Sequence, residues 1–365
     1  MSTESDVMAV AGILALLYRI TPAAVSEGPA GTATRNYVAE DREGRRWFVK
    51  AYPRGTDMEA ERQALALGEA ATAAGVTVPA VRRTVTGEVI ASADGLSVSV
   101  TEYIAGTETA EGGLSGGRWD AVGEAVGRLH RALARHPVGP PRPVAAREVC
   151  DIARAGRRLE KLLAQWAAVP PAPAGFAAWC AQAAEQRLSA LPEVAARLEK
   201  LPVTLTAQVV HGDLASPNLL LRGEAVAAVI DFRPPGHRSA VWELGRIVLD
   251  PRSVLARPDE WIPGLARAVG AYRAANPELV AEDLLAVPRV AAGYLACSVY
   301  PLSEPLDSPA SVTPALEAYG RARHEAVGPC GRAWRKPRRC SVTPCSELPA
   351  GTLTLMQLMI VAVVQ

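Results

Sequence analysis

The first hundred residues alternate short apolar runs with turn residues, a pattern typical of a small antiparallel sheet. The turns Asp41-Arg42-Glu43-Gly44 and Ala93-Asp94-Gly95 are hairpin signals between neighbouring runs. A helix interrupts the series, beginning near Glu59 and ending near Gly75, and an apolar helix over the first twenty residues is expected to cover the sheet. The pattern predicts strands over residues 35–41, 45–52, 81–84, 88–91 and 96–101.

From about residue 105 onward, the apolar residues follow the spacing of amphipathic helices. Val122, Val126, Leu129 and Leu133, for example, share one face of a helix over residues 119–136. The same spacing predicts a helix that starts at residue 242 and others over residues 147–166, 176–200, 261–275 and 288–299. The fold class is therefore α+β, with a small antiparallel sheet followed by a larger, mainly helical part.

A short polar stretch interrupts this helical pattern. It reads His211-Gly212-Asp213-Leu214-Ala215-Ser216-Pro217-Asn218, and Asp231-Phe232 follows after two aliphatic runs, residues 219–221 and 225–230. The two runs are joined by Arg222-Gly223-Glu224 and predict a small buried hairpin. Both polar segments therefore lie at the same end of that hairpin.

The chemistry of these two segments is that of phosphoryl transfer. Magnesium binds hard oxygen ligands and keeps several waters, so the amide oxygen of Asn218, the carboxylate of Asp231 and nucleotide phosphates suffice as ligands. Asp213 then lies beside the metal, where it can orient an incoming hydroxyl and accept its proton. Because phosphoryl transfer depends mainly on positioning and charge neutralisation, one base and two metal ligands complete the site.

Each part also has a simpler interpretation. The His-Gly-Asp stretch by itself fits an ordinary turn, and Asp231 by itself fits a helix cap. The two segments together, in this order and joined by apolar runs, favour the phosphotransferase site. His211 is expected to brace the loop through hydrogen bonds rather than to move protons, and His130 to be a packed helix residue.

Residues 211–218 with Asp231 resemble the catalytic and metal-binding loops of the aminoglycoside phosphotransferase family. These small-molecule kinases are related in fold to choline kinases and protein kinases. The protein-kinase loop has the form H-R-D-L-x-x-x-N followed by D-F-G, and here Gly212 replaces the arginine and Arg233 the glycine.

This resemblance covers about residues 25–325 and implies a two-lobed, protein-kinase-like fold. It implies that Asp213 is the catalytic base and that Asn218 and Asp231 bind magnesium. Relatives often carry an aspartate where Glu243 stands. The longer glutamate fits the same bracing role, a reshaped acceptor pocket, or an exposed acid in the first turn of a helix. We expect three regions: a nucleotide-binding N-lobe over residues 1–104, a catalytic and acceptor-binding C-lobe over residues 105–327, and an atypical, disordered tail over residues 328–365.

The N-terminal part carries candidate nucleotide ligands. Lys50 lies late in a predicted strand, and an acidic residue at the start of the following helix can hold its ammonium group over the phosphates. The leucine spacing favours Glu61 for this role, with Glu59 as the alternative, although Lys50 also fits a solvated strand residue.

Two further segments complete this half. The loop over residues 28–34 contains Gly31, and small residues allow backbone N–H groups to approach phosphates closely. By resemblance and position, backbone groups near Glu102 and Ile104 form the hinge that pairs with the adenine edge.

These features predict a phosphotransferase that moves the γ-phosphate of ATP or GTP, with Mg²⁺, to a hydroxyl of a small molecule. Only residues 232–241 separate Asp231 from the next helix, where a protein kinase inserts a long activation segment, so a small-molecule acceptor is favoured. An antibiotic and a metabolite or biosynthetic intermediate fit equally well. The alternative of another class is a nucleotide-binding regulatory pseudokinase. Such a protein is expected to have lost one of four residues, all of which are present here: Lys50, Asp213, Asn218 and Asp231.

The charge pattern bears on the acceptor. A polycationic aminoglycoside calls for an acidic pocket. Residues 106–327 carry 24 acidic and 24 basic side chains, so the larger part has no acidic bias. A local acidic cluster could still form, although a solvated face is the simpler interpretation for its candidates: Glu282, Asp283, Glu304 and Asp307.

Composition limits the other partners. The net charge of +1 and the pI near 7.6 argue against a nucleic-acid binder, which usually carries a basic excess. Glu4 and Asp6 precede the first apolar run, where a secretory signal needs a basic start, so a cytoplasmic protein is expected. The apolar run over residues 352–364 is too short to cross a bilayer. Three widely spaced cysteines are expected to be reduced core thiols: Cys150, Cys180 and Cys297.

Overall fold

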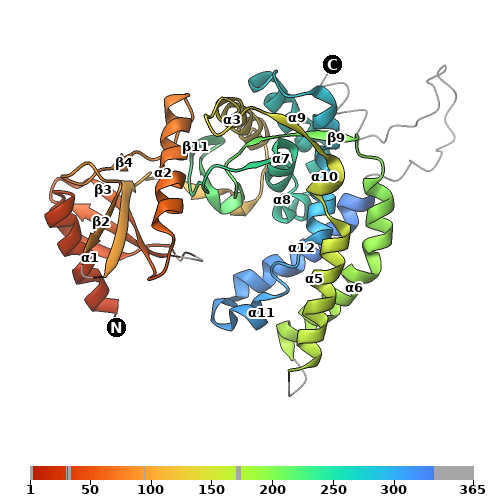
Figure 1. Cartoon of the computed structure of the whole chain (residues 1–365), viewed down its shortest axis with the longest axis horizontal. Coiled ribbons are helices and arrows are strands. Elements are labelled where there is room, and N and C mark those ends of the chain that lie inside the picture. Colours follow the sequence, from red (N-terminus) through yellow and green to blue (C-terminus); the bar gives the residue numbers. More distant parts are fainter. Residues whose placement is uncertain (1–2, 30, 32–33, 94, 170–173, 333–365) are drawn as a thin grey trace.

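The computed structural model describes residues 3–29, 31, 34–93, 95–169 and 174–332. A small lobe built on a sheet lies at one end of the molecule and a larger helical lobe at the other (Figure 1). This arrangement confirms the predicted α+β, two-lobed architecture. Helix α12 (Pro314–Arg332) continues across the expected start of the tail, and the rest of that tail lies outside the described residues. The lobe boundaries at residues 104 and 327 remain predictions.

The small lobe contains a six-stranded antiparallel sheet. The strand order is β1-β2-β3-β6-β4, and β5 also pairs with β6. The sequence pattern missed β1, because this edge strand is mostly exposed and lacks an apolar alternation. The elements are α1 (Thr3–Leu17), β1 (Pro22–Glu27), β2 (Arg35–Asp41), β3 (Arg46–Tyr52), α2 (Met58–Ala73), β4 (Val81–Arg82), β5 (Ile90–Ala93) and β6 (Leu96–Glu102).

Helix α1 covers one face of this sheet. Ile13 and Leu14 are buried in the core of the small lobe together with residues of β3 and β6. Just beyond the helix, the Tyr18 hydroxyl donates to the carbonyl of Val98 at 2.9 Å and accepts from the N–H of Ala91 at 3.1 Å. The first apolar helix therefore packs on the sheet, as predicted.

Helix α2 lies between the sheet and the larger lobe (Figure 1). Asp57 caps its first turn by accepting from the N–H groups of Glu59 and Ala60 at 3.0 and 3.1 Å. Its buried residues Leu67 and Ala71 belong to the hydrophobic core of the larger lobe rather than to that of the small lobe. Helix α2 thus couples the nucleotide half to the catalytic half.

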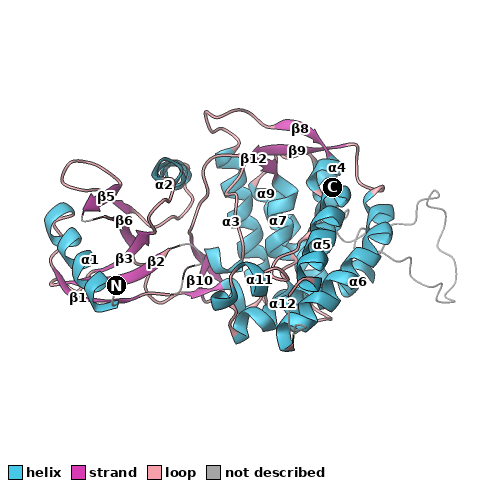
Figure 2. Ribbon diagram, turned by 60° about the horizontal axis from the view of Figure 1, so that its bottom comes forward, coloured by secondary structure: helices cyan, strands magenta, loops and turns pink. Residues whose placement is uncertain are grey.

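The larger lobe is mainly helical and includes two three-stranded antiparallel sheets, ordered β11-β10-β7 and β12-β9-β8. Strands β8, β9 and β12 lie together at one edge of this lobe (Figure 2). The hairpin β10–β11 is the one predicted between the two polar segments. The elements are β7 (Glu108–Thr109), α3 (Arg118–Leu133), β8 (Arg142–Ala145), α4 (Ala146–Val149), α5 (Ile152–Ala167), α6 (Gly175–Leu198), β9 (Thr204–Val209), β10 (Leu219–Arg222), β11 (Ala225–Val229), β12 (His237–Ser239), α7 (Ala240–Val248), α8 (Pro251–Ala256), α9 (Trp261–Ala275), α10 (Ala281–Cys297), α11 (Glu304–Asp307) and α12, with short 3-10 turns at Ala110–Gly112, Ser216–Asn218 and Pro309–Ser311.

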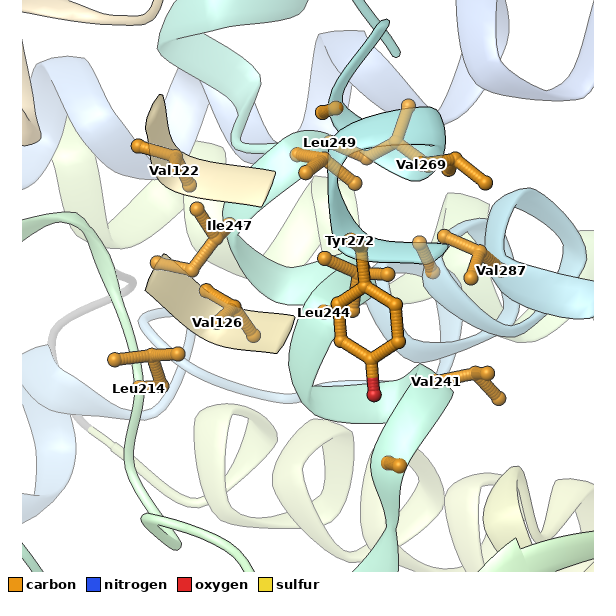
Figure 3. Packing of buried hydrophobic residues seen from close by; sticks show 14 of the residues in the cluster. Val122, Val126, Leu214, Val241, Leu244, Ile247, Leu249, Val269, Tyr272 and Val287 are labelled. Atoms are coloured by element: carbon orange, nitrogen blue, oxygen red, sulfur yellow. The ribbon is translucent and has the colours of Figure 1, made fainter. Parts of the chain in front are cut away.

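Helix α7 lies at the centre of the core of this lobe. Leu244 and Ile247 of α7 are buried among residues of α3, α9 and α10 (Figure 3). Helices α3 and α9 approach closely at Gly123, where a Cβ would collide with the carbonyl of Ala268. Because α7 follows the second polar segment after a short connection and β12, this packing fixes the wall to which α7 contributes Trp242 and Arg246.

Helix α10 begins at Ala281 and runs through Pro288, where the sequence predicted its start. Proline favours the first turn of a helix because it lacks an N–H group. A helix start at Pro288 was therefore predicted, and this prediction is wrong. Leu284, Val287 and Val290 are fully buried, so packing holds the helix across the missing hydrogen bond.

The predictions on cysteines agree with the structure. Cys150 and Cys180 are buried free thiols, and Cys297 is a partly buried one. Within the described ranges, no helix has the length and apolar character needed to cross a membrane.

Candidate active site

The first polar segment follows β9 and turns sharply at Gly212. The backbone φ of Gly212 is +90°, which favours glycine, and a Cβ there would lie 2.8 Å from the Cβ of Arg233. The N–H of Arg233 donates to the carbonyl of His211 at 3.0 Å and joins the two polar segments. The arginine that protein kinases carry at this place would not fit here, because Arg233 occupies the space.

His211 braces this loop, as predicted. Its Nδ1 accepts from the N–H of Asp213 at 3.2 Å, so its Nε2 carries the proton and donates to the carbonyl of Ile230 at 2.8 Å. The ring also packs on Phe232, with the ring centroids 4.3 Å apart. Burial lowers the pKa of His211, and a neutral imidazole is the form that this hydrogen-bond pattern needs.

Glu243 of α7 holds the same loop from behind. Its side chain is completely buried and accepts from the N–H groups of His211 and Gly212 at 2.9 and 2.8 Å. Burial alone would raise the pKa of Glu243, but hydrogen bonds, first of all that from His130, lower it below its ordinary value. Glu243 is therefore a buried, ionised brace, and the interpretation as an exposed acid is wrong.

A chain of hydrogen bonds supports Glu243 in turn. The Nε2 of His130 lies 3.1 Å from the Glu243 carboxylate, and its Nδ1 lies 2.9 Å from the Tyr272 hydroxyl. The side-chain amide of Asn276 donates to that hydroxyl at 3.2 Å. These groups are buried, so His130 is a packed helix residue, as predicted, and it also orients the brace.

Asn218 and Asp231 come together at the end of the β10–β11 hairpin. The N–H of Ile230 donates to the carbonyl of Asn218 at 3.0 Å, which places Asp231 beside Asn218. The amide nitrogen of Asn218 donates to the carbonyl of Asp213 at 2.9 Å, so the amide oxygen is left for a cation. Asp231 has a φ of +65°, a conformation that clusters at functional sites. One amide oxygen and one carboxylate fit Mg²⁺, which takes its other ligands from water and phosphate.

Lys50 of β3 reaches across to the larger lobe and forms an ion pair with Asp231. Desolvation would raise the pKa of Asp231, but the ammonium group of Lys50 lowers it below its ordinary value. The predicted partner Glu61 makes no ion pair in the part of the chain that the structure describes, and Glu59 pairs with Arg62 instead. Lys50 does not pair with Glu61 here, because the ammonium group of Lys50 is paired with the carboxylate of Asp231.

Gly31 lies in the connection between β1 and β2. A Cβ at this position would lie 2.8 Å from the carbonyl oxygen of Thr34, so a side chain would not fit. Residues 30, 32 and 33 of the same loop lie outside the described residues. The phosphate-binding role of Gly31 therefore remains a prediction.

The predicted hinge follows the end of β6. The N–H of Glu102 donates to the carbonyl of Ala80 at 2.9 Å and is occupied. The carbonyl of Ile104 accepts from the Thr107 hydroxyl at 2.8 Å, whereas no described residue accepts the N–H of Ile104. The N–H of Ile104 is therefore available to a nucleotide base.

Asp213 is flanked by Arg246, which the sequence did not indicate as a site residue, and by Arg233, which the sequence indicated only as the replacement for the glycine of the D-F-G motif. Arg246 of α7 lies 2.9 Å from its Oδ1, and Arg233 lies 3.4 Å from its Oδ2. Arg246 is mostly buried and lies over the rings of Trp242 and Tyr294. The spacing of Trp242 and Arg246 was an available signal, since residues four apart share one face of a helix.

A cavity of about 540 Å³ opens beside Asp213. Its walls come from the first polar segment, the short connection after Asp231, β12, α7 and α10. This volume is in the range of small-molecule sites. The short connection, which is an activation segment in protein kinases, here forms a wall of the cavity.

One member of the acidic cluster considered from the sequence does not lie on a solvated face. Asp283, expected on a solvated face, is buried and accepts from the N–H of Thr206 at 2.8 Å. Among the described residues, no group of three or more histidine, cysteine or acidic side chains is arranged to hold a metal ion. The predicted magnesium site is of another kind, because it consists of one carboxylate and one amide, from Asp231 and Asn218.

Comparisons with known proteins agree with this geometry. The profile of the phosphotransferase enzyme family matches residues 25–281, while no curated protein matches the chain. A spectinomycin phosphotransferase in its AMP-bound complex is similar in structure, with a TM-score of 0.64 and 13% identity, covering 90% of this chain and 99% of its own. An amicoumacin kinase in complex with AMP-PNP and Ca²⁺ has a TM-score of 0.60 and 18% identity, covering 90% of this chain and 96% of its own.

A microcompartment-associated aminopropanol kinase is also similar, with a TM-score of 0.55 and 22% identity, covering 89% of this chain and 95% of its own. At these identities the solved structures establish the shared fold. The family match covers most of the chain and confirms the enzyme class expected from the sequence, a small-molecule phosphotransferase. The chain belongs to the phosphotransferase enzyme family, as its resemblance to the aminoglycoside phosphotransferases predicted.

Proposed function

We propose that this enzyme transfers the γ-phosphate of ATP to a hydroxyl group of a small molecule. The observation that carries the proposal is the convergence of Asp213, Asn218 and Asp231 at one end of a hairpin, with Lys50 reaching them from the small lobe. Structures of similar proteins with AMP and AMP-PNP support a nucleotide donor.

Each residue would have one task with the donor. Lys50 would bind the α- and β-phosphates, and the N–H of Ile104 would pair with the base. Asn218 and Asp231 would hold Mg²⁺, which neutralises the charge of the phosphates when it is bound. Glu61 would approach Lys50 only after the ion pair between Lys50 and Asp231 opens, so that Asp231 can serve the metal.

Asp213 would orient the acceptor hydroxyl and take its proton. The acceptor oxygen forms a bond to the γ-phosphorus while the bond from that phosphorus to the β-phosphate oxygen breaks, and ADP leaves. The cavity beside Asp213 gives the acceptor its place. Its wall is the short connection after Asp231, which has no room for a peptide-docking segment and so supports a small acceptor.

The test is the variant Asp213→Asn, with Asp259→Asn as the matched control on an exposed loop. Binding of AMP-PNP should survive in Asp213→Asn, while ADP release in the presence of acceptors should fall by about a thousandfold or more. The control should keep its turnover. Unchanged turnover in Asp213→Asn would remove the mechanism, and intact nucleotide binding without any turnover in the wild type would favour a regulatory pseudokinase.

The same assay, run with GTP in place of ATP, decides the donor. Run with hydroxylated antibiotics and metabolites, it separates an antibiotic-inactivating kinase from a metabolite kinase. The similar spectinomycin phosphotransferase and amicoumacin kinase motivate the first group of acceptors, and the aminopropanol kinase motivates the second.

A further inference from the structure

The cavity beside Asp213 is basic. Its lining includes Arg233, Arg238 and Arg246, and the carboxylate of Asp213 is the acidic side chain among its lining residues. Guanidinium groups in one cavity repel each other unless anions separate them. An arginine that has no carboxylate partner within the protein is therefore available to bind an anionic ligand.

Arg246 is already paired. Its Nη2 lies 2.9 Å from Oδ1 of Asp213, and its guanidinium lies 4.9 Å from the centroid of the Trp242 ring and 5.5 Å from that of Tyr294. Only 13% of its side chain is exposed. Arg246 thus balances the charge of Asp213 and positions it, which leaves the charge of the other two arginines uncompensated.

Arg238 and Arg233 supply that uncompensated charge. Arg238, on β12, is exposed and lies over the Trp242 ring at 5.2 Å, and no carboxylate among the described residues pairs with it. Arg233 has 57% of its side chain exposed, and its ion pair is the long one of 3.4 Å to Asp213, which Arg246 already neutralises. The charge of Arg233 also acts on the carboxylate of Asp231, which is already paired with Lys50. Both guanidinium groups are therefore available to a ligand in the cavity.

Aromatic rings form the other part of the wall. Trp242 and Tyr294 meet edge to face, with centroids 5.7 Å apart and an interplanar angle of 86°. Both side chains are half-buried and line the cavity. Such walls favour a ligand with an apolar or aromatic face, and a volume of about 540 Å³ accommodates a molecule of one or two rings.

We propose that the acceptor is a hydroxyl compound that carries an anionic group, a carboxylate or a phosphate, bound by Arg238 and Arg233. The proposal rests on the proposed function, because it names the substrate class of the same site. With the anion on these two arginines, a hydroxyl group of the same molecule can face Asp213, which lines the same cavity. Arginine binds both kinds of anion with paired hydrogen bonds. A polycationic acceptor would instead meet uncompensated positive charge.

The test uses probes of one shape and three charges: meta-hydroxymethyl benzoate, the corresponding benzamide and the corresponding benzylamine. A fourth probe, meta-hydroxymethyl phenyl phosphate, separates a phosphate from a carboxylate. Equilibrium binding is measured by calorimetry in the presence of AMP-PNP and Mg²⁺, and turnover is measured as ADP release with ATP. We expect the dissociation constant of an anionic probe to be lower than that of the amide by a factor of about ten or more, and the amine to bind most weakly.

The variant Arg238→Gln should abolish this preference and leave the affinity for AMP-PNP unchanged. Its matched control is Arg128→Gln, which removes the same charge from an exposed position on α3 and should behave like the wild type. Arg233→Gln should give a smaller loss than Arg238→Gln, because Arg233 is shared with Asp213.

Several outcomes overturn the proposal. If the amide or the amine binds as tightly as the anionic probes or more tightly, the acceptor is not anionic and the proposal is wrong. If any probe is still phosphorylated, the proposed function stands. Binding of AMP-PNP without binding of any anionic probe also overturns the proposal. An equal loss of turnover for all probes in Arg238→Gln, with the anion preference retained, would assign Arg238 to the transferred phosphate instead. Failure of the proposed function is recognised separately, by the absence of both nucleotide binding and ADP release.

Discussion

Asp213 has two sides that are built differently. Behind it, Glu243, His211 and His130 are buried and use their polar atoms in hydrogen bonds within the protein. In front of it, Arg233 and Arg238 remain exposed to the cavity and lack a carboxylate of their own. The rear side holds the geometry of the loop, and the front side has charge left over for a ligand.

This contrast indicates which positions of the enzyme tolerate substitution. A buried charge that loses its partners is strongly destabilising, so the rear side tolerates little substitution. Exposed charged residues contribute little to stability, so the front side can vary with the acceptor while the loop stays in place. The two sides thus separate the requirement for catalysis from the choice of substrate.

The largest effect on stability is expected from Glu243→Ala. This change leaves the N–H groups of His211 and Gly212 buried without an acceptor, and we expect a loss of about 3–5 kcal/mol in the free energy of unfolding, with loss of turnover. Chemical denaturation measures it, with the exposed Glu185→Ala as control. A loss no larger than that of the control would contradict the role of Glu243 as a brace.

A smaller loss, about 3 kcal/mol, is expected for Gly212→Ala, from its positive φ together with the contact to Arg233. Gly223→Ala is a matched control, because Gly223 has a φ of +61° and open space around it, and should cost about 1 kcal/mol. The double variant Gly212→Ala/Arg233→Gly, which removes the Cβ of Arg233, should recover part of the difference. Equal losses at both glycines would show that Arg233 does not crowd the loop.

The pH dependence of stability probes His211. Because burial keeps its folded-state pKa below the ordinary value of 6.5, the unfolded chain takes up a proton that the folded protein excludes. The free energy of unfolding should therefore fall as the pH drops from about 6.5, by up to about 1.4 kcal/mol per pH unit. The His211→Asn variant should show a flatter curve down to about pH 5. Parallel curves for the two proteins would rule out this coupling.

The smallest effect on stability is expected from Arg233→Gln on the front side. Its contact with Asp213 is long and exposed, so the free energy of unfolding should change by less than about 0.5 kcal/mol. Thermal denaturation alongside the acceptor measurements checks this. A loss of more than roughly 2 kcal/mol, which is the size of a rear-side effect, would mean that the two sides are not distinct.

The sequence was sufficient for what depends on neighbours along the chain. The hairpin that joins Asn218 to Asp231 follows from apolar runs and a turn, and helices such as α9 follow from the spacing of their apolar residues. The bracing role of His211 follows from its place beside Asp213 in a tight loop. These features are set by hydrogen bonds and packing between residues close in sequence.

Which charged side chains from distant segments form contacts depends on the tertiary structure. Glu243 could be placed on a helix from sequence, but not inside the core, because burial depends on how α3, α9 and α10 surround α7. The pairing of Lys50 with Asp231 and of Arg246 with Asp213 likewise joins segments far apart in the chain. Local sequence patterns do not encode such contacts. The sequence around a charged side chain does not show whether its partner is water or a buried carboxylate, because water is excluded only when the fold packs.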